Sequence, residues 1–547
     1  MRIALALAST VVGVVLMAAA ALASPSAAHD RAKASAASGT LRIEDDSDFD
    51  YLDPQLGYVQ TTWELEHATQ VTLFAFPDKN GEAGKALVPE GAAGNPIISA
   101  DGKTYTFKIR PGFRFSDGTP VTAQNYAFAM LRALSPKMSS PAAQFLTDII
   151  EGAAAYNVGT ASSVSGIATP NGATLVVKLK NQASDLIARL SMPFFAATRT
   201  NLPLDPAGVS VYPSAGPYYI VSRTPDRQVV LKPNPYYTGS RPVRFATIDF
   251  EIGNSLDTIQ YDVETGRSDY AETGLNPTAY ATLAQQFGVN KTQFWVFPVL
   301  GVSYLALNHD RPLFKNNPQL SKAINWATDR HALVVQGGAF VGKRNDHILP
   351  PGMDGYIDKH FYPNSPNFTV AKKLAAGHTR DGKAVLFTTS RTADLNRAAI
   401  YQYDLKQIGL DVSVQTFSFA TLIRMTELRG ASYDLVPLNW IADYPDPYDF
   451  VNVQLDGSKL QADNNVNAAF YDNPTYVREM EAAARLTGYA RFHAYGELDL
   501  KMIKNDPPWA VRYNFNDRIF VSKRIGCMTF PPGLALVDIA ALCLKGS

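Results

Sequence analysis

The sequence predicts an α/β protein with several structural units, and three observations support this fold class. The chain has 547 residues, and at roughly 150 residues per domain this length predicts three or more units. Residues 384–389, 393–408 and 410–414 have the patterns of a strand, a helix and a strand, which predict a βαβ unit with parallel strands. Residues 101–179 are rich in alternating strands and hairpin turns, which is typical of a separate α+β unit.

The first half of the chain is predicted to alternate short strands with single helices. The Asp-Gly pair at 101–102 and the Asn-Gly pair at 171–172 are hairpin turns, each followed by a strand pattern. Thr122 begins a helix, and Pro136 ends it. The strands expected here are 40–43, 104–110, 173–179, 218–221, 228–232 and 246–252, and the helices are 62–73, 125–134 and 259–265.

The second half contains the longest helical pattern and the candidate ligand loop. Residues 318–335 carry apolar side chains at helical spacing, which predicts one amphipathic helix. Residues 433–438 predict a buried strand that ends in a loop over 439–450. Because Pro445 and Pro447 remove backbone donors there, we predict no helix and no shared helical face for Asp443, Asp446 and Asp449. Loops at strand ends are where α/β proteins bind ligands.

The charge balance favours a neutral or small ligand. Lys+Arg and Asp+Glu both number 50, so nothing in the net charge points to nucleic acid, an acidic membrane surface or a polyanionic substrate. Hydrophobic residues make up 46% of the chain and charged residues 18%, so disorder is not expected beyond the ends. We expect a monomer that does not bind nucleic acid.

The N-terminus has the pattern of a secretory signal peptide. Arg2 precedes an uncharged run over 3–23 that closes on a small-x-small pattern, which predicts cleavage after Ala23. Residues 24–39 are rich in Ala and Ser and predict a flexible leader. The mature protein is therefore expected in the periplasm or otherwise outside the cytoplasmic membrane. The apolar run is long enough to span a bilayer, so an uncleaved anchor is the alternative.

The two cysteines, Cys527 and Cys543, both lie near the C-terminus. In an oxidising compartment they are expected to pair and tie down the tail. The alternative is two free buried thiols. Two cysteines without a nearby pair of histidines do not make a closed zinc site.

Motifs for catalysis and cofactors are absent from the sequence. Residues 337–344 imitate a phosphate-binding loop but lack its final Ser/Thr and follow a helix instead of a strand. The zinc-protease, Cys-x-x-Cys and serine-hydrolase motifs do not occur, so we expect no cofactor and no metal. One alternative keeps Asp443, Asp446 and Asp449 as oxygen ligands for calcium. A second alternative is a secreted hydrolase that uses these acids as acid and base.

Ten short motifs in a fixed order carry a resemblance over nearly the whole mature chain. They are Leu52-Asp53-Pro54, residues 105–120, Gly216-Pro217-Tyr218, Asn234-Pro235-Tyr236-Tyr237, Gly266-Arg267-Ser268-Asp269, Asn308, Pro312-Leu313-Phe314, residues 322–330, Leu349-Pro350-Pro351-Gly352 and residues 440–447. In this order the motifs resemble the extracytoplasmic solute-binding proteins of family 5, the peptide and nickel class that feeds ABC importers.

The resemblance implies a two-lobed clamp of the periplasmic-binding-protein type, with mixed sheets and a hinge between the lobes. By this analogy lobe I is built from 40–78, 206–298 and 508–547. An extra α+β domain of lobe I would cover 79–205, and lobe II would cover 299–507.

The resemblance also implies a non-enzymatic receptor that captures a peptide or another amine-bearing solute by hinge closure and delivers it to a membrane permease. Asp443 would receive the ligand's α-ammonium through a charge-assisted bond in a dry cleft. Trp440 would cover the apolar part, and Asn439 and Ile441 would offer backbone hydrogen bonds. Asn439 stands where peptide binders commonly have glycine, so its side chain would crowd the cleft or supply an amide. A metal-chelate binder is a further alternative, but it would want a histidine near Trp440.

Overall fold

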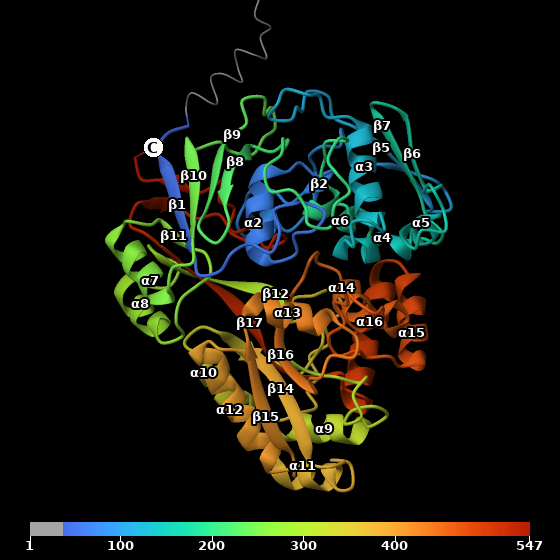
Figure 1. The fold of residues 1–547 in the computed structure, drawn as a ribbon, viewed down its shortest axis with the longest axis vertical. Coiled ribbons are helices and arrows are strands. Elements are labelled where there is room, and N and C mark those ends of the chain that lie inside the picture. The colour runs from blue at the N-terminus through green and yellow to red at the C-terminus, as the bar shows by residue number, and fades with distance from the viewer. Residues whose placement is uncertain (1–36, 547) are drawn as a thin grey trace, which may run out of the picture.

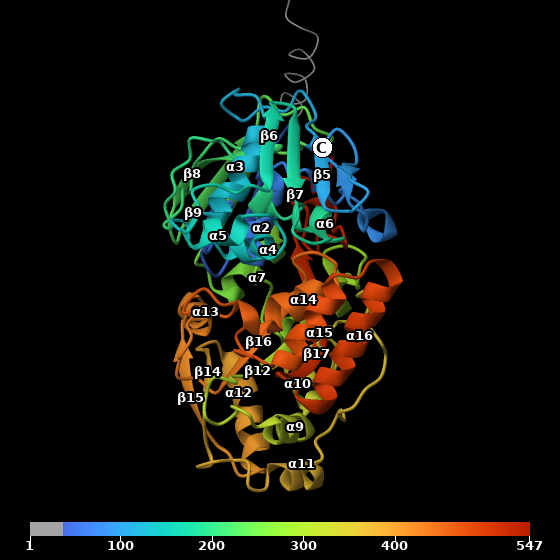
Figure 2. The same ribbon diagram turned by 90° about the vertical axis from the view of Figure 1, so that its right-hand side faces the viewer.

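A computed structural model describes residues 37–546 of the chain. The molecule has two lobes, one above the other in Figures 1 and 2. The predicted two-lobed α/β clamp is confirmed. The predicted signal peptide over 1–23 and the first part of the leader, up to residue 36, lie outside the described residues.

The upper lobe in Figure 1 is organised around β1, the first strand of the described chain. Its strands are β1 (Thr40–Asp45), β8 (Tyr218–Thr224), β9 (Gln228–Pro233), β10 (Thr247–Ile252) and β11 (Tyr270–Ala271), and its helices are α2 (Gln60–Thr69), α7 (Leu256–Thr265) and α8 (Ala279–Phe287). β1 runs parallel to both β10 and β11. The carboxyl ends of β1 and β11 therefore meet at the edge that faces the lower lobe (Figure 1).

The upper lobe carries an α+β unit on one side, as the hairpin-rich pattern predicted. Its antiparallel sheet has the order β4-β5-β7-β6, built from β4 (Ile97–Ile98), β5 (Thr104–Lys108), β6 (Ile167–Asn171) and β7 (Thr174–Lys178). The helices beside it are α3 (Ala123–Leu134), α4 (Gln144–Thr147), α5 (Ala153–Asn157) and α6 (Leu186–Arg189), and a two-stranded pair of β2 (Phe74–Ala75) and β3 (Val88–Pro89) leads into it. The Asn125 side chain accepts from the Thr122 backbone N–H at 2.8 Å, which caps α3 at the predicted residue.

The lower lobe contains the predicted βαβ unit. β14 (Lys383–Thr389) and β15 (Asp411–Phe417) are parallel and are joined by α12 (Thr392–Lys406). The other strands are β13 (Gly342–Arg344) and β16 (Leu435–Ile441), and the other helices are α9 (Pro318–Ala327), α10 (Arg330–Gln336), α11 (Phe368–Ala375), α13 (Phe419–Glu427), α14 (Pro447–Leu455), α15 (Pro474–Ala484) and α16 (Gly488–Asn505).

Two long antiparallel strands, β12 (Phe294–Leu307) and β17 (Trp509–Val521), run through both lobes. They join all the larger strands into an 11-stranded sheet of the described chain, with the order β15-β14-β16-β12-β17-β11-β1-β10-β9-β8 and β13 beside β17. Their register shifts between Pro298 and Val302, where the pairing passes from one lobe to the other. Because a bulge weakens the ladder and bends it, this is where the two lobes can hinge.

The prediction of a single helix over 318–335 is wrong. The segment forms α9 and α10, with an interruption at Thr328 and Asp329. Thr328 takes an extended conformation, and its hydroxyl donates to the Ile324 carbonyl at 2.8 Å. The Asp329 side chain accepts from the Ala332 N–H at 2.9 Å and so begins a new helix.

The prediction that prolines exclude a helix from 439–450 is also wrong. α14 begins at Pro447, directly after the N-cap Asp446, whose side chain accepts from the Tyr448 N–H at 2.8 Å. A proline at the first helical position removes only an N–H that has no partner inside the helix. Pro445 stays outside α14, and Asp449 lies in its first turn.

Cys527 and Cys543 form the predicted disulfide between the short strands β18 (Ile525–Cys527) and β19 (Cys543–Leu544). The bond closes a loop with a sequence separation of 16, and a disulfide that closes a loop of that size stabilises the folded state by about 3 kcal/mol in the chain-entropy model.

We expect a double variant, Cys527→Ser with Cys543→Ser, to unfold several degrees below the wild type in calorimetry. Adding a reductant should lower the midpoint of the wild type only, and equal midpoints for the two proteins would contradict this expectation.

Candidate functional site

The candidate site lies where Asp443, just beyond the end of β16, meets Tyr58, just before α2. The Tyr58 hydroxyl donates to Asp443 Oδ2 at 2.7 Å. The two residues are 385 positions apart in sequence and come from opposite lobes. This contact therefore forms only when the lobes are closed over the space between them.

Asp449 holds the loop around Asp443 in place. One oxygen, Asp449 Oδ2, accepts from the Asp443 backbone N–H and from Trp440 Nε1, both at 3.0 Å. Its other oxygen has no hydrogen-bond partner among the described residues. Asp449 is fully buried, so its role is to fix Trp440 and the Asp443 backbone.

Burial changes the ionisation of both acids. It raises the pKa of Asp443 to about 7, although the hydrogen bond from Tyr58 opposes the change. Burial and the neighbouring Asp443 raise the pKa of Asp449 well above its usual range. Among residues 37–546 no basic side chain forms an ion pair with Asp443, and a bound ammonium group would supply the compensating cation for its ionised form.

Aromatic rings surround the Tyr58 hydroxyl and the Asp443 carboxylate. The Tyr58 ring lies edge-to-face against Trp440 at 6.1 Å and against Phe194 at 5.2 Å between centroids. Trp63 and Phe145 complete the cluster at 5.8 and 6.3 Å from Tyr58. The site therefore combines one acid with an apolar, aromatic wall, which suits an organic cation.

The backbone of β16 offers a free edge beside this acid. The Ala442 N–H donates to the Leu300 carbonyl of β12 at 2.8 Å. Hydrogen-bonded pairs alternate along an antiparallel ladder, so Trp440 also bonds to β12, whereas the backbone groups of Asn439 and Ile441 point to the opposite edge. On that side, within residues 37–546, β14 pairs with β16 only at Leu435. Asn439 and Ile441 can therefore pair with an extended ligand.

The Asn439 side chain lies on the face of the sheet away from the Trp440 ring. Its Oδ1 accepts from Ser303 Oγ and, more weakly, from Arg512 Nη2 at 3.4 Å. Arg512 is buried and is fixed by Ser303 and by Tyr401, whose hydroxyl accepts from it at 3.2 Å. The asparagine is thus held by its own lobe and does not crowd the Asp443 site.

A ladder of alternating charges closes the side of the site, and we call it the closure ladder. Its members in order are Asp446, Arg491, Asp185, Arg189, Asp148 and Lys459, with successive ion pairs of 2.6, 3.5, 2.9, 3.1 and 3.4 Å. The lower lobe supplies Asp446, Arg491 and Lys459, and the α+β unit of the upper lobe supplies the others. The closure ladder therefore joins the two lobes. Asp446 belongs to it through its ion pair with Arg491.

A second group of acids lies where β1 and β11 end, near the junction of the lobes. These acids are Asp45, Glu64, Glu272 and Asp517, and none of them makes an ion pair among residues 37–546. Burial raises the pKa of all four, that of Asp517 to about 6. Next to them Asp46 pairs with Arg391 of the lower lobe at 2.7 Å. A cationic group close to these acids would favour their ionised forms and lower their pKa values.

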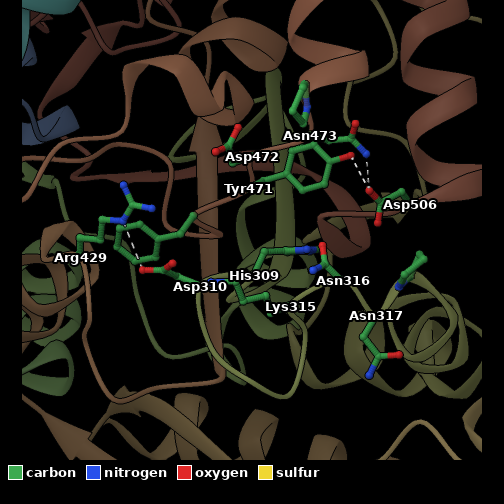
Figure 3. A pocket seen from close by; sticks show the side chains of 13 residues that line it. His309, Asp310, Lys315, Asn316, Asn317, Arg429, Tyr471, Asp472, Asn473 and Asp506 are labelled. Atoms are coloured by element: carbon green, nitrogen blue, oxygen red, sulfur yellow. Dashed lines mark hydrogen bonds and ion pairs between the residues drawn. The ribbon is translucent and has the colours of Figure 1, made fainter.

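A hollow of about 490 Å³ lies elsewhere in the lower lobe and is shown in Figure 3. His309, Arg429, Tyr471 and Asp506 are among its lining residues. The Tyr471 hydroxyl donates to Asp506 at 2.9 Å. Because the lower lobe alone lines the hollow, closure of the two lobes would not enclose a ligand there.

The four residues predicted for the site lie together at the end of β16, but their contacts differ. Asp443 and Trp440 reach the cluster around Tyr58, whereas the side chains of Asn439 and Ile441 lie on the other face of the strand. The calcium alternative is not supported. Among residues 37–546, Asp443, Asp446 and Asp449 do not form a group of three whose ligand atoms all lie within 4.8 Å of one another. No sequence motif marks Tyr58 or the closure ladder, because both depend on contacts between segments far apart in the chain.

Residues 86–461 match the family model described as bacterial extracellular solute-binding proteins, family 5 middle. A curated relative, the probable D,D-dipeptide-binding periplasmic protein DdpA of Escherichia coli K12, is 26% identical over 492 residues, which cover 89% of this chain and 90% of the relative. Among the helices of residues 37–546, none has the length and apolar character needed to cross a membrane.

Solved structures share the fold over nearly the whole chain. Clavulanic acid biosynthesis oligopeptide binding protein 2 has a TM-score of 0.82 at 23% identity, covering 93% of this chain and 96% of its own. The ABC transporter-associated periplasmic binding protein DppA from Helicobacter pylori, in complex with peptide STSA, has a TM-score of 0.79 at 19% identity, covering 95% and 99%. With the family model matching well over half of the sequence, the chain belongs to the bacterial extracellular solute-binding proteins of family 5.

Proposed function

We propose that this protein is the extracytoplasmic receptor of an ABC importer and that it binds peptides or similar solutes with a free amino group. The observation that carries the proposal is the junction of the free β16 edge at Asn439 and Ile441 with the buried carboxylate of Asp443. An extended main chain would pair with that edge, and its α-ammonium would then reach Asp443. A relative that is named as a probable D,D-dipeptide-binding protein and a structural neighbour that was solved in complex with a peptide support this ligand class.

Ligand binding would be coupled to closure through charge. In the closed form without a ligand, burial raises the pKa of Asp443 to about 7, so an ionised Asp443 there costs free energy at neutral pH. A ligand ammonium would remove that cost in the closed form only. A ligand shifts a conformational equilibrium only by such a difference in affinity. The closed form would then be the one presented to the permease.

The proposed receptor has no catalytic role. The hydrolase alternative needs acids that are free to exchange protons with a substrate across the cleft. Asp446 is instead paired with Arg491 at 2.6 Å, and Asp449 binds Trp440 and the Asp443 backbone.

We further propose that the protein is secreted with cleavage after Ala23 and that the mature receptor is a monomer. We also propose the division into lobe I, extra domain and lobe II given above.

The function can be tested by native mass spectrometry of the mature protein purified without refolding, followed by thermal shift with a library of di- to pentapeptides. A bound peptide mass, or a rise of the unfolding midpoint that saturates with one peptide class, is the expected result. If only sugars or metal chelates raise the midpoint, the peptide assignment is wrong.

The affinity for such a peptide should depend on pH through Asp443. In the closed form without a bound cation, burial raises the pKa of Asp443 to about 7, whereas a bound ammonium requires the ionised form. Below the pKa that Asp443 has in the ligand-free protein, the carboxyl must lose a proton on binding, and the affinity should therefore fall by up to about tenfold per pH unit as the pH decreases. Calorimetry in buffers with different ionisation enthalpies measures this proton release. An Asp443→Asn variant should show a flat profile, and a flat profile in the wild type would contradict the assignment.

A further inference from the structure

A second site of a different kind lies in the upper lobe, away from Asp443. His67, Asp78 and Asp538 each offer one ligand atom, and these atoms lie within 4.8 Å of one another. The polar atoms that face one another around the imidazole are His67 Nε2, Asp78 Oδ1 and Asp538 Oδ2. None of the three has a hydrogen-bond partner within the described chain. The side chains are 9%, 15% and 1% exposed. Three unsatisfied polar atoms that converge in one buried place need an explanation.

The separations between these atoms suit a shared ion better than direct bonds. His67 Nε2 is 3.6 Å from Asp78 Oδ1 and 3.9 Å from Asp538 Oδ2, which is longer than a normal N–H···O bond. Nitrogen and oxygen ligands each about 2.0 Å from one tetrahedral metal ion lie about 3.3 Å apart. Small side-chain movements would bring the three atoms to that geometry.

The charge around the three atoms is also that of a cation site. Glu90 lies nearby, and its carboxylate pairs with Arg241 Nε at 2.7 Å. Arg241 also donates to the backbone carbonyls of His67 and Gln70. When Asp78, Asp538 and Glu90 are ionised and His67 is neutral, the three carboxylates exceed the single guanidinium of Arg241 by two negative charges. One divalent cation would balance them.

The three ligands come from distant parts of the chain. His67 lies in the last turn of α2, Asp78 lies in the loop after β2, and Asp538 lies in the C-terminal segment before β19. Asp538 Oδ1 accepts from the Ala541 N–H at 3.2 Å, so the carboxylate is already oriented with its other oxygen free. A shared ion would fasten the C-terminal segment to α2.

We propose that His67, Asp78 and Asp538 bind one divalent transition-metal ion, zinc by the type of ligands, with water as the fourth ligand. One imidazole and two carboxylates are a donor set that zinc accepts at tetrahedral positions. The ion would stabilise the upper lobe together with the nearby disulfide. It would have no part in solute binding, so this site stands independently of the proposed function.

A second cluster, Asp346, His347 and His360, supplies a matched control. It also has ligand atoms within 4.8 Å of one another. In contrast to the proposed site, His360 Nδ1 there contacts Asp346 Oδ1 directly, and Asp346 Oδ2 accepts from the Phe361 and Tyr362 N–H groups, both at 2.8 Å. Since that carboxylate is already satisfied, a His360→Gln variant should leave zinc binding unchanged.

The test uses the mature protein after treatment with a chelator and dialysis, with zinc chloride as the only addition. Calorimetry should give one zinc ion per chain, and the unfolding midpoint should rise with zinc concentration. His67→Gln and Asp538→Asn should each abolish both effects, whereas His360→Gln should keep them. Circular dichroism confirms that the variants fold, and peptide affinity should not change in any of them.

Two results would overturn the proposal. One is that the wild-type protein does not bind one zinc ion per chain. This result would mean that Asp78 and Asp538 share a proton beside His67 instead. The other is zinc binding that persists in both His67→Gln and Asp538→Asn, which would place the ion elsewhere.

Discussion

Replacing Asp443 with asparagine is expected to weaken the binding of a small peptide with a free α-amino group by about 2–4 kcal/mol, which is roughly 30- to 1,000-fold in Kd. The substitution keeps the size of the side chain and leaves an acceptor for the Tyr58 hydroxyl, which now donates to Asp443 Oδ2 at 2.7 Å. What it removes is the charge that would hold the ammonium. Isothermal titration calorimetry measures the change.

The peptide itself provides the sharpest control for this experiment. N-acetylation of the same peptide removes its positive charge, so the acetylated peptide should bind weakly to the wild type and no more weakly to Asp443→Asn. An Asp411→Asn variant, which removes an exposed carboxylate of the same lobe, should bind like the wild type. Equal losses for both peptide forms in Asp443→Asn would mean that the residue acts on the fold and not on the ammonium.

Replacing Arg132 with methionine is expected to lower the stability of the upper lobe by about 3–5 kcal/mol, because it leaves a buried carboxylate without its counter-charge. Arg132 and Asp53 are both 0% exposed. Arg132 Nη2 donates to Asp53 Oδ2 at 2.6 Å, Nη1 donates to Gln55 Oε1 at 2.7 Å, and Nε donates to the Pro203 carbonyl at 2.9 Å. The pair ties α3 to the segment that leads to Tyr58.

Urea unfolding followed by tryptophan fluorescence measures this loss, and peptide affinity should also fall because Tyr58 is no longer held firmly. Lys85→Ala provides a matched control, since it breaks an ion pair whose side chains are 55% and 87% exposed. Exposed pairs contribute little, so this variant should unfold like the wild type. Equal midpoints for Arg132→Met and the wild type would show that the buried pair is not required.

The local elements could be predicted from the sequence because local patterns determine them. The alternation in 173–179 and the Asn-Gly turn before it led to β7, and the strand, helix and strand patterns over 384–414 led to β14, α12 and β15. The incorrect predictions lie where one or two residues override the surrounding pattern. At Asp329 a side-chain cap starts a new helix inside an amphipathic repeat, and at Pro447 the ring fits the first turn that it was expected to prevent.

The candidate site could be predicted only in part. Asp443 and Trp440 stand out because they share one short motif. Tyr58 is 385 residues away from Asp443, and the closure ladder joins Asp148 to Lys459 over 311 residues. Nothing in the local pattern around Tyr58 marks it, because its role depends on how the lobes meet. Contacts of this kind follow from the tertiary structure and not from periodicity.

The most direct test of the account is a crystal structure of the protein with a bound tripeptide that thermal shift identifies as a ligand. We expect the peptide to lie between the lobes with its α-ammonium within about 3 Å of Asp443, and with its main chain paired to Asn439 and Ile441 of β16. A peptide whose amino group lies away from Asp443, or a ligand in the hollow of the lower lobe around Tyr471, would contradict it.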